Sequence, residues 1–289
     1  MKEIIVIVGP TGVGKTKLSI ELAKKLNAEI INADSVSIYK HLNIGSAKPT
    51  AIEQKEVPHH LIDIKELSDE YSIYNYQNDA RKKIDEIISK GKRVIIVGGT
   101  GLYIKSCLYD YRFTEGTTYK KYDNLTNEEL LERIDSYEHN LSIHVNNRKR
   151  LIRFLNKFEN NEKITNNKDT LLYPIKTIGL TTSRDNLYER INKRVDLMFQ
   201  NGLLDEVKSL KDNYSTSRIL NSAIGYKEFI DYFNGIKNLD EVKDEIKKNS
   251  RHYAKRQYTF FNNQMNVEWF NVNFNDFSKT IKNVLEYIK

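Results

Sequence analysis

Short continuous apolar runs alternate with amphipathic stretches in the first third of the chain. Residues 3–8 (EIIVIV), 28–33 (AEIINA) and 93–97 (RVIIV) predict strands, because uninterrupted apolar runs are typical of strands covered on both faces. Leucines at helical spacing in residues 17–26 and inward-facing apolar positions in residues 74–90 predict the intervening helices. The alternation indicates an α/β protein with a doubly wound parallel sheet flanked by helices.

The pattern changes between about Thr114 and Tyr173, where no buried-strand run occurs. A capping box at Thr126 and Glu129 opens one helix, residues 146–158 predict a second and very basic helix, and residues 159–169 are a polar loop. We therefore predict an all-helical insertion domain, 114–173, within an α/β core made of residues 1–113 and 174–289.

The chain is predicted to return to the sheet at residues 175–180 (IKTIGL) and to be mainly helical afterwards. A last short strand is expected around Val267, Trp269 and Phe270. The predicted helices are Leu187 to Gln200, Leu203 to Lys211, Ser222 to Asn234 and Leu239 to Phe261.

The segment GPTGVGKT, between the first strand and the first helix, matches the phosphate-loop pattern G-x-x-x-x-G-K-[ST]. Its glycines let backbone N–H groups surround phosphate oxygens at a helix N-terminus, where the helix dipole favours anions. Lys15 adds a positive charge, and the Thr16 hydroxyl is a candidate Mg²⁺ ligand. The predicted residues for binding a diphosphate or triphosphate are Gly9, Pro10, Thr11, Gly12, Val13, Gly14, Lys15 and Thr16.

Two neighbouring strand ends carry further candidate groups. The third strand ends in Gly98-Gly99-Thr100, without the carboxylate that ATPases and GTPases use to hold Mg²⁺. Gly98 and Gly99 either leave room for a ligand or form a tight turn. Asp34 follows the second strand, at the edge where ligands of parallel sheets bind. It could orient Mg²⁺ through water, accept a proton from a nucleophile or cap a helix N-terminus.

The net charge of +7 and an isoelectric point near 9.1 favour an acidic partner, with nucleic acid first among the candidates. The single cysteine, Cys107, excludes an intramolecular disulfide and a cysteine-based zinc cage. No apolar run approaches the roughly 18 residues of a membrane helix, and the first residues lack a signal-peptide layout. We therefore expect a cytoplasmic protein that makes no membrane contact. Its basic clusters are Arg150, Arg153 and Lys157 in one predicted helix and Arg251, Lys255 and Arg256 in another.

Several segments, in order along nearly the whole chain, resemble the tRNA isopentenyltransferase (dimethylallyltransferase) family in its short bacterial form. The resembling segments are GPTGVGKT (9–16), ADSVSIYKHLNIGSAKP (33–49), PHHLIDI (58–64), VGGTGLY (97–103), HVNNRKRLIRFL (144–155), RDNLYERINKRVDLMFQNGL (184–203), AIGYKEF (223–229) and YAKRQYTFF (253–261). The resemblance implies a phosphate-loop fold that holds dimethylallyl diphosphate with Mg²⁺. It also implies transfer of the allyl group to the exocyclic amine of the adenosine 3′ of a tRNA anticodon.

The resemblance further implies roles for single residues. Asp34 would be the general base, Thr100 would contact the substrate adenosine, and Lys15 and Arg194 would stabilise the diphosphate, with Arg184 a weaker candidate. Between Tyr109 and Leu125 the resemblance assigns no tRNA contact. The implied tRNA-binding residues are Asp34, Ser35, Val36, Ser37, Thr100, Lys149, Arg150, Leu151, Ile152, Arg153, Ser222, Ala223, Ile224, Gly225, Tyr226 and Lys227.

Other functions remain open at the level of the residues alone. A phosphate loop with lid arginines suits a small-molecule or nucleotide kinase equally well, and a nucleotide-dependent RNA-binding module needs no transfer chemistry. If the target is a base in an anticodon loop, it must leave its stack, and Tyr39 or Tyr103 could flank it. We expect a monomer, because the core and the insertion together could hold one anticodon stem-loop.

Overall fold

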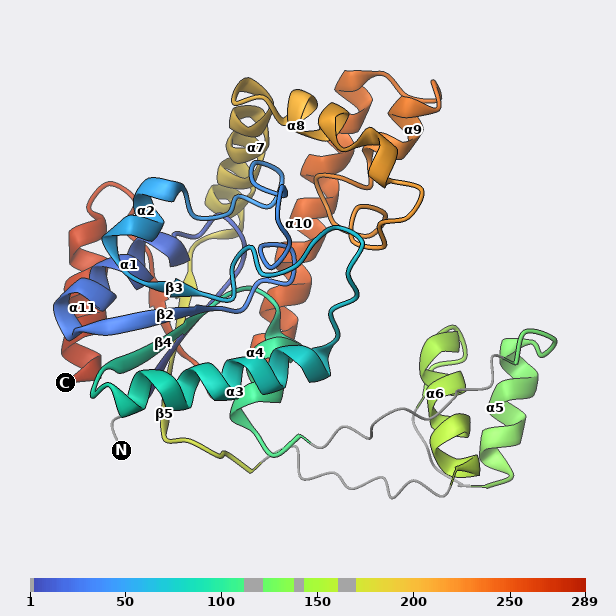
Figure 1. Cartoon of the computed structure of the whole chain (residues 1–289), viewed down its shortest axis with the longest axis horizontal. Helices are drawn as coiled ribbons and strands as arrows, with labels where there is room; N and C mark the ends of the chain where they lie inside the picture. The colour runs from blue at the N-terminus through green and yellow to red at the C-terminus, as the bar shows by residue number, and fades with distance from the viewer. Residues whose placement is uncertain (1–2, 112–121, 138–142, 161–169) are drawn as a thin grey trace. The chain divides into compact units, whose positions relative to one another are not determined.

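The computed structural model of the chain describes residues 3–111, 122–137, 143–160 and 170–289. Within them, six strands form one parallel sheet in the order β3-β2-β4-β1-β5-β6 (Figure 1). The predicted parallel α/β sheet is therefore confirmed. The strands are β1 (Ile4–Val8), β2 (Ala28–Asn32), β3 (His59–His60), β4 (Arg93–Val97), β5 (Ile175–Thr181) and β6 (Glu268–Asn271).

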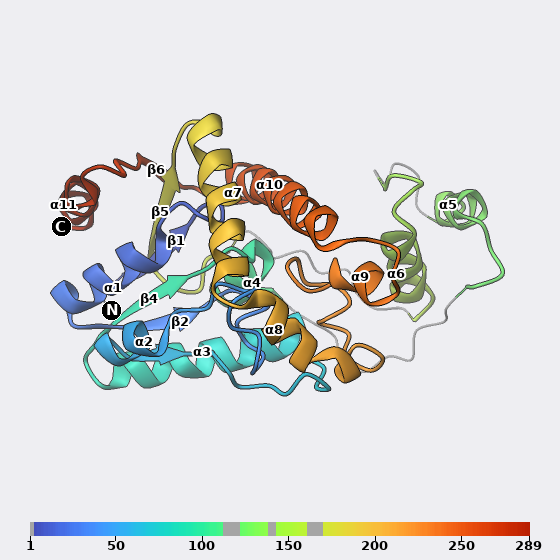
Figure 2. The same cartoon turned by 90° about the horizontal axis from the view of Figure 1, so that it is seen from above.

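Helices cover both faces of this sheet, with α1 on one side and α3 on the other (Figure 2). None of the helices in the described part of the chain is long and apolar enough to span a membrane. The helices of the α/β unit are α1 (Lys15–Leu26), α2 (Ala51–Glu56), α3 (Ile73–Ser89), α4 (Gly101–Leu108), α7 (Arg184–Gln200), α8 (Leu203–Ser209), the 3₁₀ helix η1 (Lys211–Asn213), α9 (Phe229–Phe233), α10 (Leu239–Gln264) and α11 (Phe277–Ile288).

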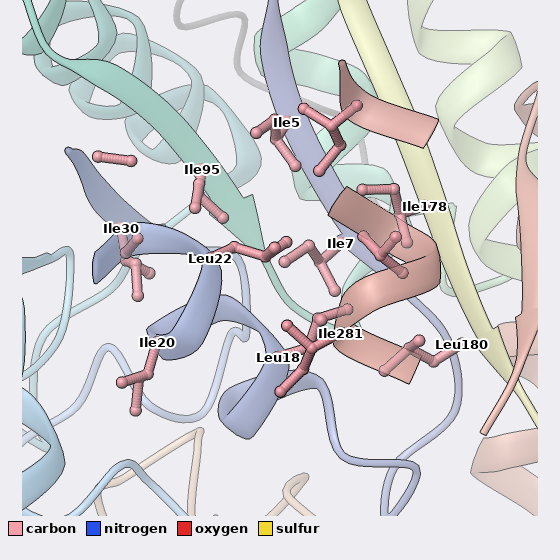
Figure 3. Close-up of a cluster of buried hydrophobic side chains, with 14 of the residues drawn as sticks. Ile5, Ile7, Leu18, Ile20, Leu22, Ile30, Ile95, Ile178, Leu180 and Ile281 are labelled. Carbon is pink, nitrogen blue, oxygen red and sulfur yellow. The ribbon is translucent and has the colours of Figure 1, made fainter. Parts of the chain in front are cut away.

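A large apolar core lies between the sheet and helices α1 and α11 (Figure 3). Ile7 of β1 and Ile178 of β5 contribute to it from the sheet, and Leu18, Leu22 and Ile281 contribute from the helices. All five residues of β1 are buried, as the continuous apolar run predicts. The core thus fixes the start of α1, which is also the end of the phosphate loop.

Most predicted elements are confirmed, but the helix predicted over Ser222 to Asn234 is wrong for its first half. Residues 222–228 form turns, and only α9 is helical. Gly225 has φ +94°, a left-handed conformation that a helix does not contain. The pattern did not predict the short elements α2, β3 and α4, or the C-terminal helix α11.

The chain divides into two compact units, one of Met1–Tyr109 with Leu171–Lys289 and one of Asp110–Thr170. In the second unit, α5 (Asn127–Asp135) packs against α6 (Arg148–Glu159) through an apolar cluster of its own. The predicted capping box is present, since Thr126 Oγ1 accepts from the Glu129 N–H at 3.2 Å. The predicted polar loop lies mostly outside the described residues, as do residues 112–121.

A buried carboxylate stabilises the edge of the sheet away from the site. Glu29 of β2 is 4% exposed and contacts His60 Nε2 at 2.6 Å, Lys92 Nζ at 2.7 Å and Lys90 Nζ at 3.8 Å. Burial alone would raise the pKa of Glu29, but the hydrogen bonds from Lys92 and His60 lower it below its ordinary value. The folded state therefore favours the ionised form of Glu29.

We expect Glu29→Gln to lower the free energy of unfolding by about 2 kcal/mol at pH 7, because it replaces a buried carboxylate that accepts hydrogen bonds from partly exposed Lys92 and His60. A carboxyl with a depressed pKa stabilises the fold above its unfolded pKa and loses that contribution as pH falls. The difference from wild type should therefore shrink below about pH 4. Urea unfolding across pH tests this. As a control, Glu86→Gln removes the partly exposed pair with Lys83 and should cost less than about 0.5 kcal/mol. An unchanged difference at low pH would contradict the prediction.

Candidate active site

Three strand ends meet at one edge of the sheet because β2, β4 and β1 are adjacent and parallel. Val97 of β4 is the register partner of both Ile7 and Asn32. The pairing continues beyond the strands, since the Ala33 N–H donates to Val97 O at 2.8 Å and the Thr100 N–H donates to Ala33 O at 3.1 Å. Thr100 thus lies between the phosphate loop and the turn that follows β2.

The side chain of Lys15, at the end of the phosphate loop, forms hydrogen bonds with backbone oxygens at the start of the loop. Lys15 Nζ donates to Gly9 O at 2.9 Å and to Pro10 O at 2.8 Å. Gly14 is the N-cap of α1 with φ +102°, which an L side chain rarely adopts. Of the predicted loop residues, Thr11, Lys15 and Thr16 line a cavity, whereas the Val13 side chain lies in the apolar core.

That cavity, here the polar cavity, has a volume of about 80 Å³. It lies beyond the carboxyl ends of the strands, and its wall combines apolar groups with many hydroxyl, amide and charged groups. These polar groups belong to Thr11, Lys15, Thr16, Ser19, Asn32, Asp34, Ser37, Ser46, His59 and Arg194. The arrangement suits a phosphate ligand, because cationic groups and a helix N-terminus converge on it.

Asp34 projects from a turn rather than from a helix. Residues 35–38 form turns, and Asp34 Oδ1 accepts from the Val36 N–H at 2.9 Å, while Oδ2 makes no hydrogen bond to any described residue. Thr100 Oγ1 accepts from the Ser35 N–H at 3.1 Å and lies 3.3 Å from Ser35 Oγ. Thr100 therefore holds the turn that carries Asp34.

A second cavity, here the central cavity, has a volume of about 270 Å³. Apolar side chains supply much of its wall, and Thr11, Asp34, Ser46 and Arg194 line both this cavity and the polar one. The apolar side chains come from Val36, Ile191, Val195, Met198, Ile219, Ala223, Ile224 and Ile246. Asp34 thus lies where a phosphate-type site meets an apolar one.

A third cavity, here the tyrosine cavity, shares Ser35, Ile219 and Ser222 with the central cavity. It is lined by three aromatic groups, one cation and two carboxylates, namely Tyr39, Tyr71, Tyr103, Arg218, Asp69 and Glu70. Tyr103 also stacks on Tyr76 with a centroid distance of 4.2 Å. Both tyrosines predicted to flank a base, Tyr39 and Tyr103, therefore line this cavity.

Two cations face one carboxylate at the junction of the cavities. Burial, together with the nearby positive charge of Arg194, lowers the pKa of Lys15 to about 7, although Asp34 opposes the shift. Burial also lowers the pKa of Arg194, again opposed by Asp34. Arg194 Nη2 reaches Ser46 O at 3.4 Å. Bringing an anion to this junction would therefore relieve an excess of positive charge.

The other predicted residues lie in three places. Ser222, Ala223, Ile224, Gly225 and Lys227 line the central cavity, whereas the Tyr226 side chain is buried. Arg184 is exposed and lies over the Tyr188 ring, so it does not line the polar cavity. Lys149, Arg150 and Arg153 are exposed on α6, where Leu151 belongs to the apolar cluster and Ile152 packs against it.

Four residues at the site were missed by the sequence analysis. Gln257 Oε1 accepts from the Thr11 N–H at 2.9 Å, and its Nε2 donates to Gly99 O at 3.1 Å. A side chain on Gly99 would lie 2.0 Å from Gln257 Nε2, so the second glycine of the pair makes room for the protein itself. The other three missed residues are Arg190, which donates to Gly12 O, Lys48, which donates to Tyr39 O, and Glu206.

Among the described residues, no three His, Cys, Asp or Glu side chains gather as a metal site. The oxygen donors at the polar cavity include the Thr16 and Ser37 hydroxyls and the Asp34 carboxylate. Mg²⁺ is commonly held by one or two protein oxygens together with substrate phosphates and water. The donor set therefore fits a Mg²⁺ ion that arrives with a phosphate ligand.

Known proteins of one family are similar to this chain over most of its length. The sequence model of the family described as IPP transferase matches residues 37–264. The tRNA dimethylallyltransferase of Bacillus cytotoxicus is 47% identical, over 100% of this chain and 95% of that protein. The tRNA dimethylallyltransferase of Bacillus subtilis is 48% identical, over 93% and 90%.

Solved structures of transferases from the same family also superpose on this chain. The tRNA delta(2)-isopentenylpyrophosphate transferase of Staphylococcus epidermidis superposes with a TM-score of 0.76 at 38% identity, covering 100% of this chain and 99% of that one. A eukaryotic dimethylallyltransferase acting on tRNA superposes with a TM-score of 0.80 at 27% identity, covering 93% and 74%.

We expect binding of inorganic diphosphate to take up a proton at Lys15. With a pKa of about 7, Lys15 is mostly neutral at pH 8 in the free protein, and a bound anion favours its charged form. Calorimetry at pH 8 in buffers of different ionisation enthalpy should show nearly one more proton taken up by wild type than by Lys15→Arg, whose side chain stays charged. At pH 6 the difference should vanish. Equal uptake by both proteins at pH 8 would contradict the assignment.

Proposed function

The chain belongs to the IPP transferase family, and on that premise we propose that it transfers a dimethylallyl group from dimethylallyl diphosphate to tRNA. The acceptor is the exocyclic amine of the adenosine 3′ of the anticodon, and diphosphate is released. Support for dimethylallyl transfer to tRNA comes from relatives that cover 93–100% of the chain and are named tRNA dimethylallyltransferase.

The observation that carries the proposal is the meeting of two unlike cavities at Asp34. The polar cavity suits a diphosphate, and the central cavity offers apolar side chains to a prenyl group. A cavity of about 150 Å³ holds a benzene-sized molecule, so a volume of about 270 Å³ has room for a five-carbon chain.

The leaving group gains negative charge as the allylic C–O bond breaks. Lys15 and Arg194 line the polar cavity, where such charge would develop. Preorganised cations that face developing charge typically contribute more than any other single catalytic effect. Thr16 together with phosphate oxygens would hold Mg²⁺, which would supply further positive charge to the same leaving group.

The new bond joins the allylic carbon to the adenine nitrogen, which then loses a proton. Asp34 Oδ2, which has no hydrogen-bond partner among the described residues, is the proton acceptor in this proposal. Asn32 orients the same turn, because its Oδ1 accepts from the Asp34 N–H at 3.1 Å. Thr100 acts through Ser35 to keep the carboxylate in place.

The adenine reaches the central cavity through the tyrosine cavity in this proposal. Flat aromatic walls suit an unstacked base, and Arg218 suits its phosphate. The basic helix α6 would bind the tRNA backbone at a position away from the target adenosine. We further propose that the protein is cytoplasmic and acts as a monomer.

We expect Asp34→Ala and Asp34→Asn to slow single-turnover transfer by about 10²–10⁴-fold, because neither side chain accepts a proton. Binding of tRNA and diphosphate should stay within a few-fold, since a base acts mainly in the transition state. Rapid-quench assays with labelled dimethylallyl diphosphate and a tRNA transcript measure the rate.

Three outcomes would count against this assignment of Asp34. An active Asp34→Asn enzyme would remove the general-base role and leave a turn-stabilising one. Rescue of both variants by raised Mg²⁺ would indicate a metal-holding role. Hydrolysis or transfer from ATP by wild type, without prenyl transfer, would overturn the transferase itself.

Neutralising Lys149, Arg150 and Arg153 together should weaken tRNA binding and reduce its salt dependence. All three are exposed, and no described residue forms an ion pair with any of them. Each lost phosphate contact should change the slope of log K against log salt by about 0.7–0.9. The matched control replaces the exposed lysines 279, 282 and 289 of the C-terminal region and should leave the slope unchanged. Equal slopes for both triple variants would mean that α6 is only a solvated face.

A further inference from the structure

The loop of residues 42–48 forms part of the wall between the polar and central cavities. Gly45 and Ser46 line the central cavity, and Ser46, Ala47 and Pro49 line the polar one. Arg194 reaches this loop through the Ser46 carbonyl oxygen at 3.4 Å. The position of the loop therefore decides where the guanidinium of Arg194 lies relative to a diphosphate.

The loop holds a backbone conformation that needs outside support. Ala47 has φ +49° and His41 has φ +67°, in the left-handed region that such side chains rarely adopt. A residue keeps this strained backbone conformation only when many surrounding contacts hold it there. Such residues concentrate at functional sites. At one end, Lys48 Nζ donates to Tyr39 O at 2.9 Å and also pairs with Asp63.

At the middle of the loop, the support comes from Glu206 of α8. Its carboxylate accepts from three successive backbone N–H groups, of Asn43 at 3.1 Å, Ile44 at 2.9 and 3.1 Å and Gly45 at 3.2 Å. The Tyr226 hydroxyl donates to the same carboxylate at 2.8 Å. No described Lys or Arg forms an ion pair with Glu206, so its carboxylate is stabilised by these four neutral donors and by its place in the first turn of α8.

The backbone is packed closely around this contact. A side chain on Gly45 would lie 2.6 Å from the Tyr226 ring, and one on Gly225 would lie 3.0 Å from Gly45 O. Glu228 Oε2 in turn accepts from the Gly225 N–H at 2.9 Å. Three segments distant in sequence, around residues 45, 206 and 225, thus form one tightly packed junction beside the cavities.

We propose that Glu206 is a positioning residue of the transferase, holding loop 42–48 so that Ser46 fixes Arg194 over the bound diphosphate. This inference rests on the proposed function. Charge-assisted hydrogen bonds are about twice as strong as neutral ones. Loss of the carboxylate therefore loosens the loop, and Arg194 loses its anchor although neither Arg194 nor the phosphate loop has changed.

A double-mutant cycle tests the coupling, with Glu206→Gln, Arg194→Gln and the double variant. Glu206→Gln keeps the shape of the side chain but presents an NH₂ group to backbone donors. We expect it to weaken binding of inorganic diphosphate by roughly tenfold and to raise KM for dimethylallyl diphosphate similarly. In the Arg194→Gln background, Glu206→Gln should change diphosphate affinity by less than about twofold, because the guanidinium that the loop would anchor is absent. KM for tRNA should stay within about twofold in both backgrounds.

Two further variants separate positioning from stability. Asp205→Asn removes one exposed carboxylate from the same helix turn and should leave diphosphate binding unchanged. Tyr226→Phe removes a single donor to Glu206 and should reproduce a smaller loss, about two- to threefold, even if Glu206→Gln folds poorly. All binding is measured well below each melting temperature.

The outcomes are distinguishable. A tenfold loss in both backgrounds, or a lower melting temperature with unchanged diphosphate affinity, would overturn the positioning role and leave the proposed function intact. Failure of wild type to bind diphosphate would overturn the proposed function and this inference together. Loss confined to the background that retains Arg194 supports the proposal.

Discussion

The parallel pairing of β1, β4 and β2 is the constraint on which the site depends. Because Val97 is in register with both Ile7 and Asn32, the segments that follow the three strands must leave the sheet at one level. The phosphate loop, Thr100 and Asp34 are therefore brought together by backbone hydrogen bonds, before any side chain of the site makes a contact. A shift of one residue in β2 would move Asp34 along the strand and turn the strand's side chains to the opposite face.

Much of this arrangement could be predicted from local pattern. Continuous apolar runs identify the buried strands, and the glycine and lysine spacing of the loop predicts an anion site, because both signals lie within a few consecutive residues. The start of the insertion helix at Thr126 was equally local, since a capping box is a contact between residues three apart. Asp34 is a candidate from the sequence alone because it directly follows a predicted strand.

The residues that local pattern missed act over long sequence distances. Gln257 lies 246 residues from Thr11, and Glu206 lies 163 residues from Asn43. No local sequence pattern indicates that Gln257 or Glu206 forms hydrogen bonds with these distant backbone groups. The error at residues 222–228 has the same origin, because Gly225 adopts its left-handed conformation where it packs on Gly45. Residues 222–228 have the apolar spacing of a helix, but the contact with Gly45 is compatible with turns and not with a helix.

Helix α10 contributes to both cavities from one continuous element. It is one uninterrupted helix of 26 residues, about 39 Å long, and its Gln257 connects Thr11 to Gly99. Ile246, Ser250, Tyr253 and Arg256 of the same helix line the central cavity. A proline that breaks the middle of this helix would therefore disturb the wall of the central cavity, the phosphate loop and the Gly99 turn together.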